Sequence, residues 1–123
     1  MPRAFSQPVL SALDDAKIVG VRSGDEHKFT PIWVVVVGNR VFARSWGDKR
    51  TGWYQAFRDE PKGSIQVGTR VVRVTARVVR SARLLDAMED AYAEKFGSKG
   101  NRFWVRGFRA AKRRAHSVEF VPR

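Results

Sequence analysis

The chain has 123 residues, 43% of them hydrophobic and 29% charged, which predicts one folded domain over residues 1–123 rather than a disordered tail. It has no cysteine, which excludes disulfides, thiolate metal sites and cysteine nucleophiles. The longest apolar run is Ile32 to Val37, whereas a membrane helix needs about 20 apolar residues and a signal peptide needs an apolar N-terminal segment. We therefore expect a cytoplasmic protein without a membrane segment.

The positive charge of the chain lies mainly in its second half. Lys and Arg number 24 against 12 Asp and Glu, a formal net charge of +12. Residues 1–61 hold 9 basic and 7 acidic side chains, whereas residues 62–123 hold 15 and 5. Such a field favours an anionic partner, whether nucleotide phosphate, acidic metabolite or nucleic acid. It also suits a strongly solvated surface with no partner at all.

The N-terminal third predicts a helix, a short strand and a buried strand. Residues 6–16 place apolar side chains at helical spacing. Residues 18–22 alternate as a brief strand, and the polar residues 23–28 predict a loop. Ile32 to Val37 is rich in β-branched residues and apolar on both faces, so we expect a central strand covered on each side.

A hairpin and a polar loop follow. Gly38-Asn39 precedes strand residues 41–46, and such a pair favours a two-residue hairpin turn. Residues 47–52 form a polar loop bracketed by glycines. Residues 53–58 have the spacing of a short helix that ends before Pro61.

The second half predicts two strands, a longer helix and a last strand. Residues 64–67 and 70–80 have strand character, and the latter alternates apolar and polar side chains. An amphipathic helix between Ser81 and Gly97 is indicated by the apolar residues Leu85, Met88, Tyr92 and Phe96. Residues 98–101 predict a loop, residues 103–114 fit no single period, and residues 117–121 alternate as a strand. Short strands in hairpins with few helices indicate a small antiparallel α+β barrel.

The loop 47–52 and its flanks offer the groups that bind a phosphate and a planar ring. Cations, hydroxyls and glycines gather there: Arg44, Ser45, Gly47, Lys49, Arg50, Thr51 and Gly52. The aromatic residues beside them suit a ring: Trp46, Trp53 and Tyr54. The alternative is that these aromatic side chains are core residues on either side of a charged loop.

Four segments together resemble the pyridoxamine-phosphate-oxidase-like, FMN-binding split-barrel superfamily, nearest its deazaflavin-dependent nitroreductase branch and related domains of unknown function. They are residues 30–36, 41–47, 52–57 and 65–68. The resemblance covers residues 18–80, with a weaker similarity at 117–123. It implies a six-stranded split β-barrel with short flanking helices, usually a homodimer, that binds FMN or a deazaflavin. The implied activity is that of a nitroreductase-like oxidoreductase, with hydride transfer to a small organic acceptor.

By the same resemblance, particular positions acquire roles. The cofactor is flanked by Arg44, Ser45, Trp46 and Gly47, its phosphate is held by Lys49, Arg50 and Thr51, and its ring or the substrate is bordered by Trp53 and Tyr54. Tyr54 is also the one candidate catalytic residue, as a proton donor or as a group that orients a substrate oxygen. Its alternative role is packing, with the hydroxyl at the rim.

Other functions have weaker patterns. His27 and His116 are the only histidines and stand at no metal-ligand spacing, so we expect no metal site. No Gly-x-Ser-x-Gly motif of a hydrolase is present. A nucleic-acid-binding module is one alternative, because cations and aromatic residues alternate in the C-terminal third: Arg102, Phe103, Trp104, Arg106, Phe108, Arg109, Lys112, Arg113 and Arg114. A cofactor-free interaction protein on the same barrel is the other.

Overall fold

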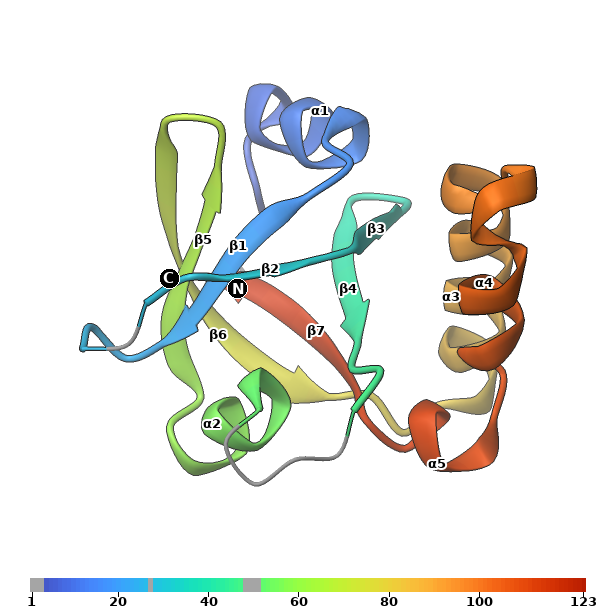
Figure 1. The fold of residues 1–123 in the computed structure, drawn as a ribbon. Helices are drawn as coiled ribbons and strands as arrows, with labels where there is room; N and C mark the ends of the chain where they lie inside the picture. The colour runs from blue at the N-terminus through green and yellow to red at the C-terminus, as the bar shows by residue number, and fades with distance from the viewer. Residues whose placement is uncertain (1–3, 27, 48–51) are drawn as a thin grey trace.

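A computed structural model describes residues 4–26, 28–47 and 52–123. These residues form an α+β split barrel in which one antiparallel sheet has the order β2-β1-β5-β6-β7-β4-β3 (Figure 1). The strands are β1 (Val19–Ser23), β2 (Thr30–Ile32), β3 (Val34–Val37), β4 (Arg40–Arg44), β5 (Lys62–Val67), β6 (Arg70–Val78) and β7 (Ser117–Pro122). The α-helices are α1 (Gln7–Asp15), α2 (Trp53–Asp59), α3 (Ala82–Phe96), α4 (Arg102–Gly107) and α5 (Ala111–Arg114), and a 3₁₀ turn spans Lys99–Asn101.

The described residues hold seven strands rather than the six expected. The strand predicted over Ile32–Val37 is interrupted at Trp33, so that its start belongs to β2 and its end forms β3. β2 pairs with β1, and β3 pairs with β4. The two edge strands of the sheet, β2 and β3, are therefore consecutive parts of one interrupted segment. Because Trp33 alone separates them, the two edges lie near each other and the sheet is almost a closed barrel.

The hairpin between β3 and β4 is confirmed. Gly38 has a positive φ of 62°, which glycine adopts without steric cost, and Val37 pairs with Arg40 across the turn. The alternation along β6 is confirmed as well, since Val74 is fully buried while Arg73 and Arg77 are exposed.

Both faces of the β3–β4 hairpin are covered by hydrophobic side chains. The inner face joins the barrel core through Val34 and Val41, and α1 and α2 also contribute to that core. The outer face carries Val35 and Phe42, which pack under α3 and α4 together with Met88, Tyr92, Phe96 and Phe108. Figure 1 shows α3 and α4 side by side along this outer face.

The amphipathic helix predicted after Ser81 is confirmed as α3. The Ser81 side chain accepts a hydrogen bond from the backbone N–H of Leu84, and the helix ends at Phe96 before Gly97. Among the residues described, no helix combines the length and the apolar character that crossing a membrane requires.

Candidate ligand-binding site

A cavity lies where the β3–β4 hairpin separates into two segments. The register pairs Val34 with Ala43, so a continued ladder would pair residues 30–33 with residues 44–47. Instead, β2 pairs with β1, and the backbone N–H of Ser45 donates to the carbonyl of His116. The two segments diverge and border an open cavity of about 420 Å³, and all eight of their residues line it.

All four tryptophans of the chain line this cavity. They are Trp33, Trp46, Trp53 and Trp104, and the wall is completed by Gly52 and Phe108. The rings of Trp46 and Trp104 meet edge to face, with centroids 4.7 Å apart. A mainly apolar cavity of this size lies within the range of about 300–1,000 Å³ that is typical of small-molecule sites.

Trp46 is held in place by α4 and α5. The Arg113 guanidinium lies 3.6 Å from the Trp46 ring centroid, and its Nε donates to the Trp46 carbonyl oxygen at 2.9 Å. A Cβ atom at Gly107 would come within 2.2 Å of the Trp46 ring and 3.4 Å of the Arg113 guanidinium. The glycine therefore allows α4 to approach the indole, which becomes a fixed wall of the cavity.

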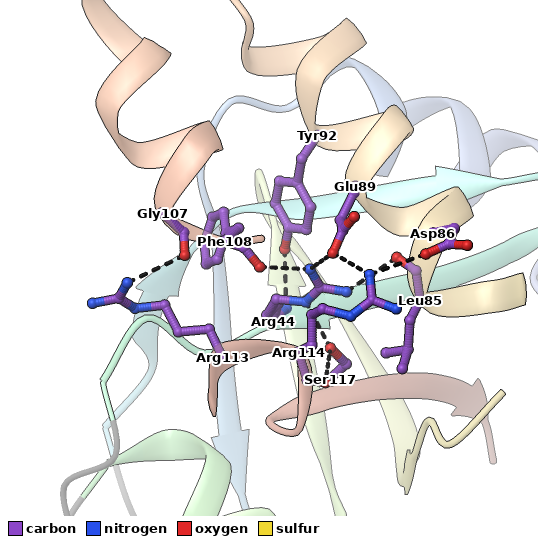
Figure 2. A network of polar contacts seen from close by, with 10 residues as sticks. All are labelled: Arg44, Leu85, Asp86, Glu89, Tyr92, Gly107, Phe108, Arg113, Arg114 and Ser117. Atoms are coloured by element: carbon purple, nitrogen blue, oxygen red, sulfur yellow. Dashed lines mark hydrogen bonds and ion pairs between the residues drawn. The ribbon is translucent and has the colours of Figure 1, made fainter. Parts of the chain in front are cut away.

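Arg44 lines the cavity, but its guanidinium belongs to a buried network (Figure 2). Its side chain is 0% exposed. Nε donates to the Ser117 hydroxyl at 2.7 Å, Nη1 to Glu89 at 3.1 Å and to the Phe108 carbonyl at 2.7 Å, and Nη2 to the Leu85 carbonyl at 3.1 Å. Burial lowers the pKa of Arg44, and the Glu89 carboxylate opposes this shift. The network fastens the end of β4 to α3 and α4.

The structure brings most of the described site candidates together. The cavity wall includes Arg44, Ser45, Trp46, Gly47 and Trp53. Tyr54 does not line it: its ring stacks on His116 with centroids 4.5 Å apart, and its hydroxyl donates to the Ala115 carbonyl at 3.2 Å. This is a packing arrangement. The remaining candidates, Lys49, Arg50 and Thr51, lie outside the described residues.

Sequence reasoning missed three aromatic residues of the wall, Trp33, Trp104 and Phe108. The sequence pattern predicts Trp33 to lie within one continuous strand. It places Trp104 and Phe108 only in an aromatic and basic segment without a clear period. A weak signal existed at Trp33, the one aromatic residue in a run of isoleucine and valines. Among residues 4–26, 28–47 and 52–123, no three His, Asp or Glu side chains come close enough together to hold a metal ion.

Comparison with solved structures shows that this chain has a split-barrel fold, which it shares with the three proteins that follow. An F420-H2 dependent reductase, FDR-A, matches with a TM-score of 0.60 and 16% identity over 85% of this chain and 93% of its own. A putative pyridoxamine 5'-phosphate oxidase from Listeria innocua matches with a TM-score of 0.56 and 10% identity over 94% and 90%. An FAD-binding protein from Mesorhizobium loti matches with a TM-score of 0.55 and 18% identity over 99% and 91%.

The particular family follows from the sequence. The chain belongs to the family described as uncharacterized protein conserved in bacteria (DUF2255), whose model matches residues 9–118. No curated protein matches the chain significantly. The solved structures confirm the resemblance to the split-barrel superfamily at the level of fold. The homodimer that the resemblance implies stays a prediction, as does the cytoplasmic location expected from the sequence.

Proposed function

We propose that this protein binds a flavin or deazaflavin nucleotide in the tryptophan-lined cavity and acts as an oxidoreductase on a small organic acceptor. The observation that carries the proposal is the convergence of all four tryptophans on one cavity. Trp33 and Trp46 come from the two diverging segments, Trp53 from α2 and Trp104 from α4. Four elements thus supply the flat apolar surfaces that a planar ring system requires.

The phosphate of the nucleotide is proposed to bind beside the same cavity. Gly47 and Gly52 line the wall, so the segment that contains Lys49, Arg50 and Thr51 starts and ends there. Two cations and a hydroxyl in that segment match the donors that a phosphate dianion prefers. Because the Arg44 guanidinium is bound to protein groups, we assign it to the support of the site rather than to the phosphate.

The two similar structures named for a cofactor support the same assignment. One is described as an F420-H2 dependent reductase and the other as an FAD-binding protein. A bound flavin or deazaflavin supplies the hydride chemistry itself. The residues of this chain would then orient the ring, exclude water through the four indoles and admit a small acceptor beside Trp104, which is 44% exposed. Tyr54 keeps a packing role in this proposal, since its hydroxyl is bonded to Ala115.

Titration with FMN and with a deazaflavin cofactor tests the proposal. Because every tryptophan lines the cavity, we expect either cofactor to quench the tryptophan emission strongly and to bind with micromolar affinity or better. The double variant Lys49→Ala/Arg50→Ala is expected to weaken binding by about 100-fold or more and to retain the fold, since a hydrogen bond to a charged group contributes roughly 1.5–3 kcal/mol.

The control is the double variant Arg70→Ala/Arg73→Ala, which removes the same charge from exposed positions of β6 outside the cavity wall. If both double variants bind the cofactor equally weakly, the loss is a general effect of the lower positive charge. The phosphate site would then not lie at residues 49–51. An unchanged emission spectrum with both cofactors at moderate salt would contradict the proposed function.

A second candidate function is the binding of single-stranded nucleic acid on α4. Phe103 is 69% exposed beside Trp104, and the exposed side chains of Arg102 and Arg106 flank them. Exposed rings with neighbouring cations suit base stacking and phosphate contact. Tight binding of a single-stranded oligonucleotide with a steep salt dependence, without cofactor binding, would favour this function over the first.

A further inference from the structure

The point at which the hairpin separates is a missing rung of the β3–β4 ladder. Val37 and Arg40 close a two-residue turn, so they form a hydrogen-bonded pair, and such pairs alternate along an antiparallel ladder. Val35 with Phe42 is the next such pair, and Trp33 with Arg44 would be the one after it. In a continued ladder the Arg44 N–H would donate directly to the Trp33 carbonyl.

The hydroxyl of Tyr92 occupies that rung. It accepts a hydrogen bond from the Arg44 N–H at 3.0 Å (Figure 2). It also donates one to the Trp33 carbonyl at 2.8 Å. A side chain from α3 has thus been inserted between the two strands. This donor and this acceptor therefore both keep a hydrogen-bond partner where the two segments separate.

Tyr92 is firmly anchored in this position. Its side chain is fully buried, and its ring lies against Phe108 with centroids 4.6 Å apart and against Phe96 with centroids 6.0 Å apart. Burial raises the pKa of Tyr92, so the hydroxyl retains the proton that it donates. The guanidinium of Arg44 is bound to the same helix at Leu85 and Glu89. α3 therefore fixes both the inserted hydroxyl and the strand beside it.

We propose that Tyr92 is a positioning residue that holds the barrel open at its split and thereby sets the width of the tryptophan-lined cavity. Beyond this rung, residues 30–33 and 44–47 no longer pair, and the cavity occupies the space between them. The effect of Tyr92 on ligand binding rests on the proposed function, whereas the effect of Tyr92 on the width of the cavity does not. Without the hydroxyl, the Arg44 N–H and the Trp33 carbonyl would pair directly and draw the two walls together.

The variant Tyr92→Phe removes only the oxygen atom. In the ligand-free protein we expect the acrylamide quenching constant of the tryptophan emission to fall at least twofold, because all four indoles line the narrowed cavity. Affinity for the cofactor that the wild-type protein binds is expected to fall at least tenfold. The control is Leu10→Ala in α1, which destabilises the barrel core outside the cavity wall and is expected to leave both values unchanged.

An unchanged quenching constant in Tyr92→Phe would overturn the proposal. If the wild-type protein binds a cofactor, an unchanged affinity of Tyr92→Phe for that cofactor would overturn it as well. If the wild-type protein binds neither cofactor, the proposed function fails while the quenching measurement still decides the role of Tyr92. If the variant does not fold, an NMR measurement on the wild-type protein tests whether the Tyr92 hydroxyl is inserted between the two segments. A scalar coupling across a direct hydrogen bond from the Arg44 nitrogen to the Trp33 carbonyl carbon would overturn the insertion, and its absence together with a slowly exchanging Tyr92 hydroxyl proton supports it.

Discussion

Replacement of Glu89 by alanine is expected to lower the free energy of unfolding by about 3–5 kcal/mol, the usual effect of removing one partner of a buried ion pair. Glu89 is the carboxylate that faces the fully buried guanidinium of Arg44 at 3.1 Å, and its own side chain is 12% exposed. It also contacts Arg114. Without Glu89, the positive charge of Arg44 would stay buried with only neutral oxygen acceptors around it. Urea denaturation at neutral pH measures the difference.

The matched control is Asp86→Ala, one turn earlier in α3. Asp86 also pairs with Arg114, at 3.0 Å, but its side chain is 67% exposed. A surface pair contributes about 0–1 kcal/mol, so we expect little change in stability. Equal losses in the two variants would show that the Arg44–Glu89 pair has no special weight, and would contradict the role assigned to the buried network.

Gly63→Ala is expected to be the most damaging of the glycine substitutions in the sheet. Gly63 lies in β5, where a Cβ atom would come 2.1 Å from the Arg22 carbonyl oxygen and 2.7 Å from the Phe57 ring. The first of these atoms belongs to the backbone of the paired strand β1, and it cannot move without breaking the β1–β5 pairing. We expect a loss of about 3 kcal/mol or more in the free energy of unfolding, at the upper end of the range for overpacked cores.

Gly100→Ala provides the comparison for this variant. A Cβ atom at Gly100 would meet no heavy atom within 4 Å, and its φ is not positive. Its stability should therefore change by less than about 0.5 kcal/mol, as for most surface substitutions. Thermal unfolding followed by circular dichroism compares the two variants. A Gly63→Ala protein as stable as Gly100→Ala would mean that β1 and β5 lie further apart than described here.

Local patterns predicted the elements whose structure depends on nearby residues. The β3–β4 turn needs only the backbone freedom of Gly38, and α3 needs only its apolar stripe and the cap at Ser81. Trp46 and Trp53, which are seven residues apart in the sequence, line the same cavity. These features depend on contacts within a few residues, which a sequence pattern contains.

The break at Trp33 could not be predicted in this way. Residues 32–37 have the composition of one buried strand, and a single tryptophan within them does not by itself indicate an interruption. The interruption arises from Tyr92, whose hydroxyl competes for the backbone of Trp33 across a separation of 59 residues. The count of six strands failed for the same reason. A long-range side-chain contact replaced a ladder hydrogen bond that the local pattern favoured.

Arg44 shows what a local pattern contains and what it omits. Its charge suggested a phosphate ligand, but alternation along β4 places its side chain on the same face as Phe42, and that face packs against α3. The burial of Arg44 was therefore present in the pattern, whereas its partners on α3 and α4 were not. The contribution of Trp104 to the cavity was absent from the sequence pattern, because residues 103–114 have no clear period.

The central claim is that a planar nucleotide binds among the four tryptophans, and the indole N–H signals of a ¹H–¹⁵N NMR spectrum test it most directly. The chain has only four such signals, and all of them arise from the cavity wall. Saturation with FMN or with a deazaflavin cofactor is predicted to shift at least three of the four, through ring currents of the bound heterocycle. Four signals that stay in place at saturating concentrations of both cofactors would contradict the account.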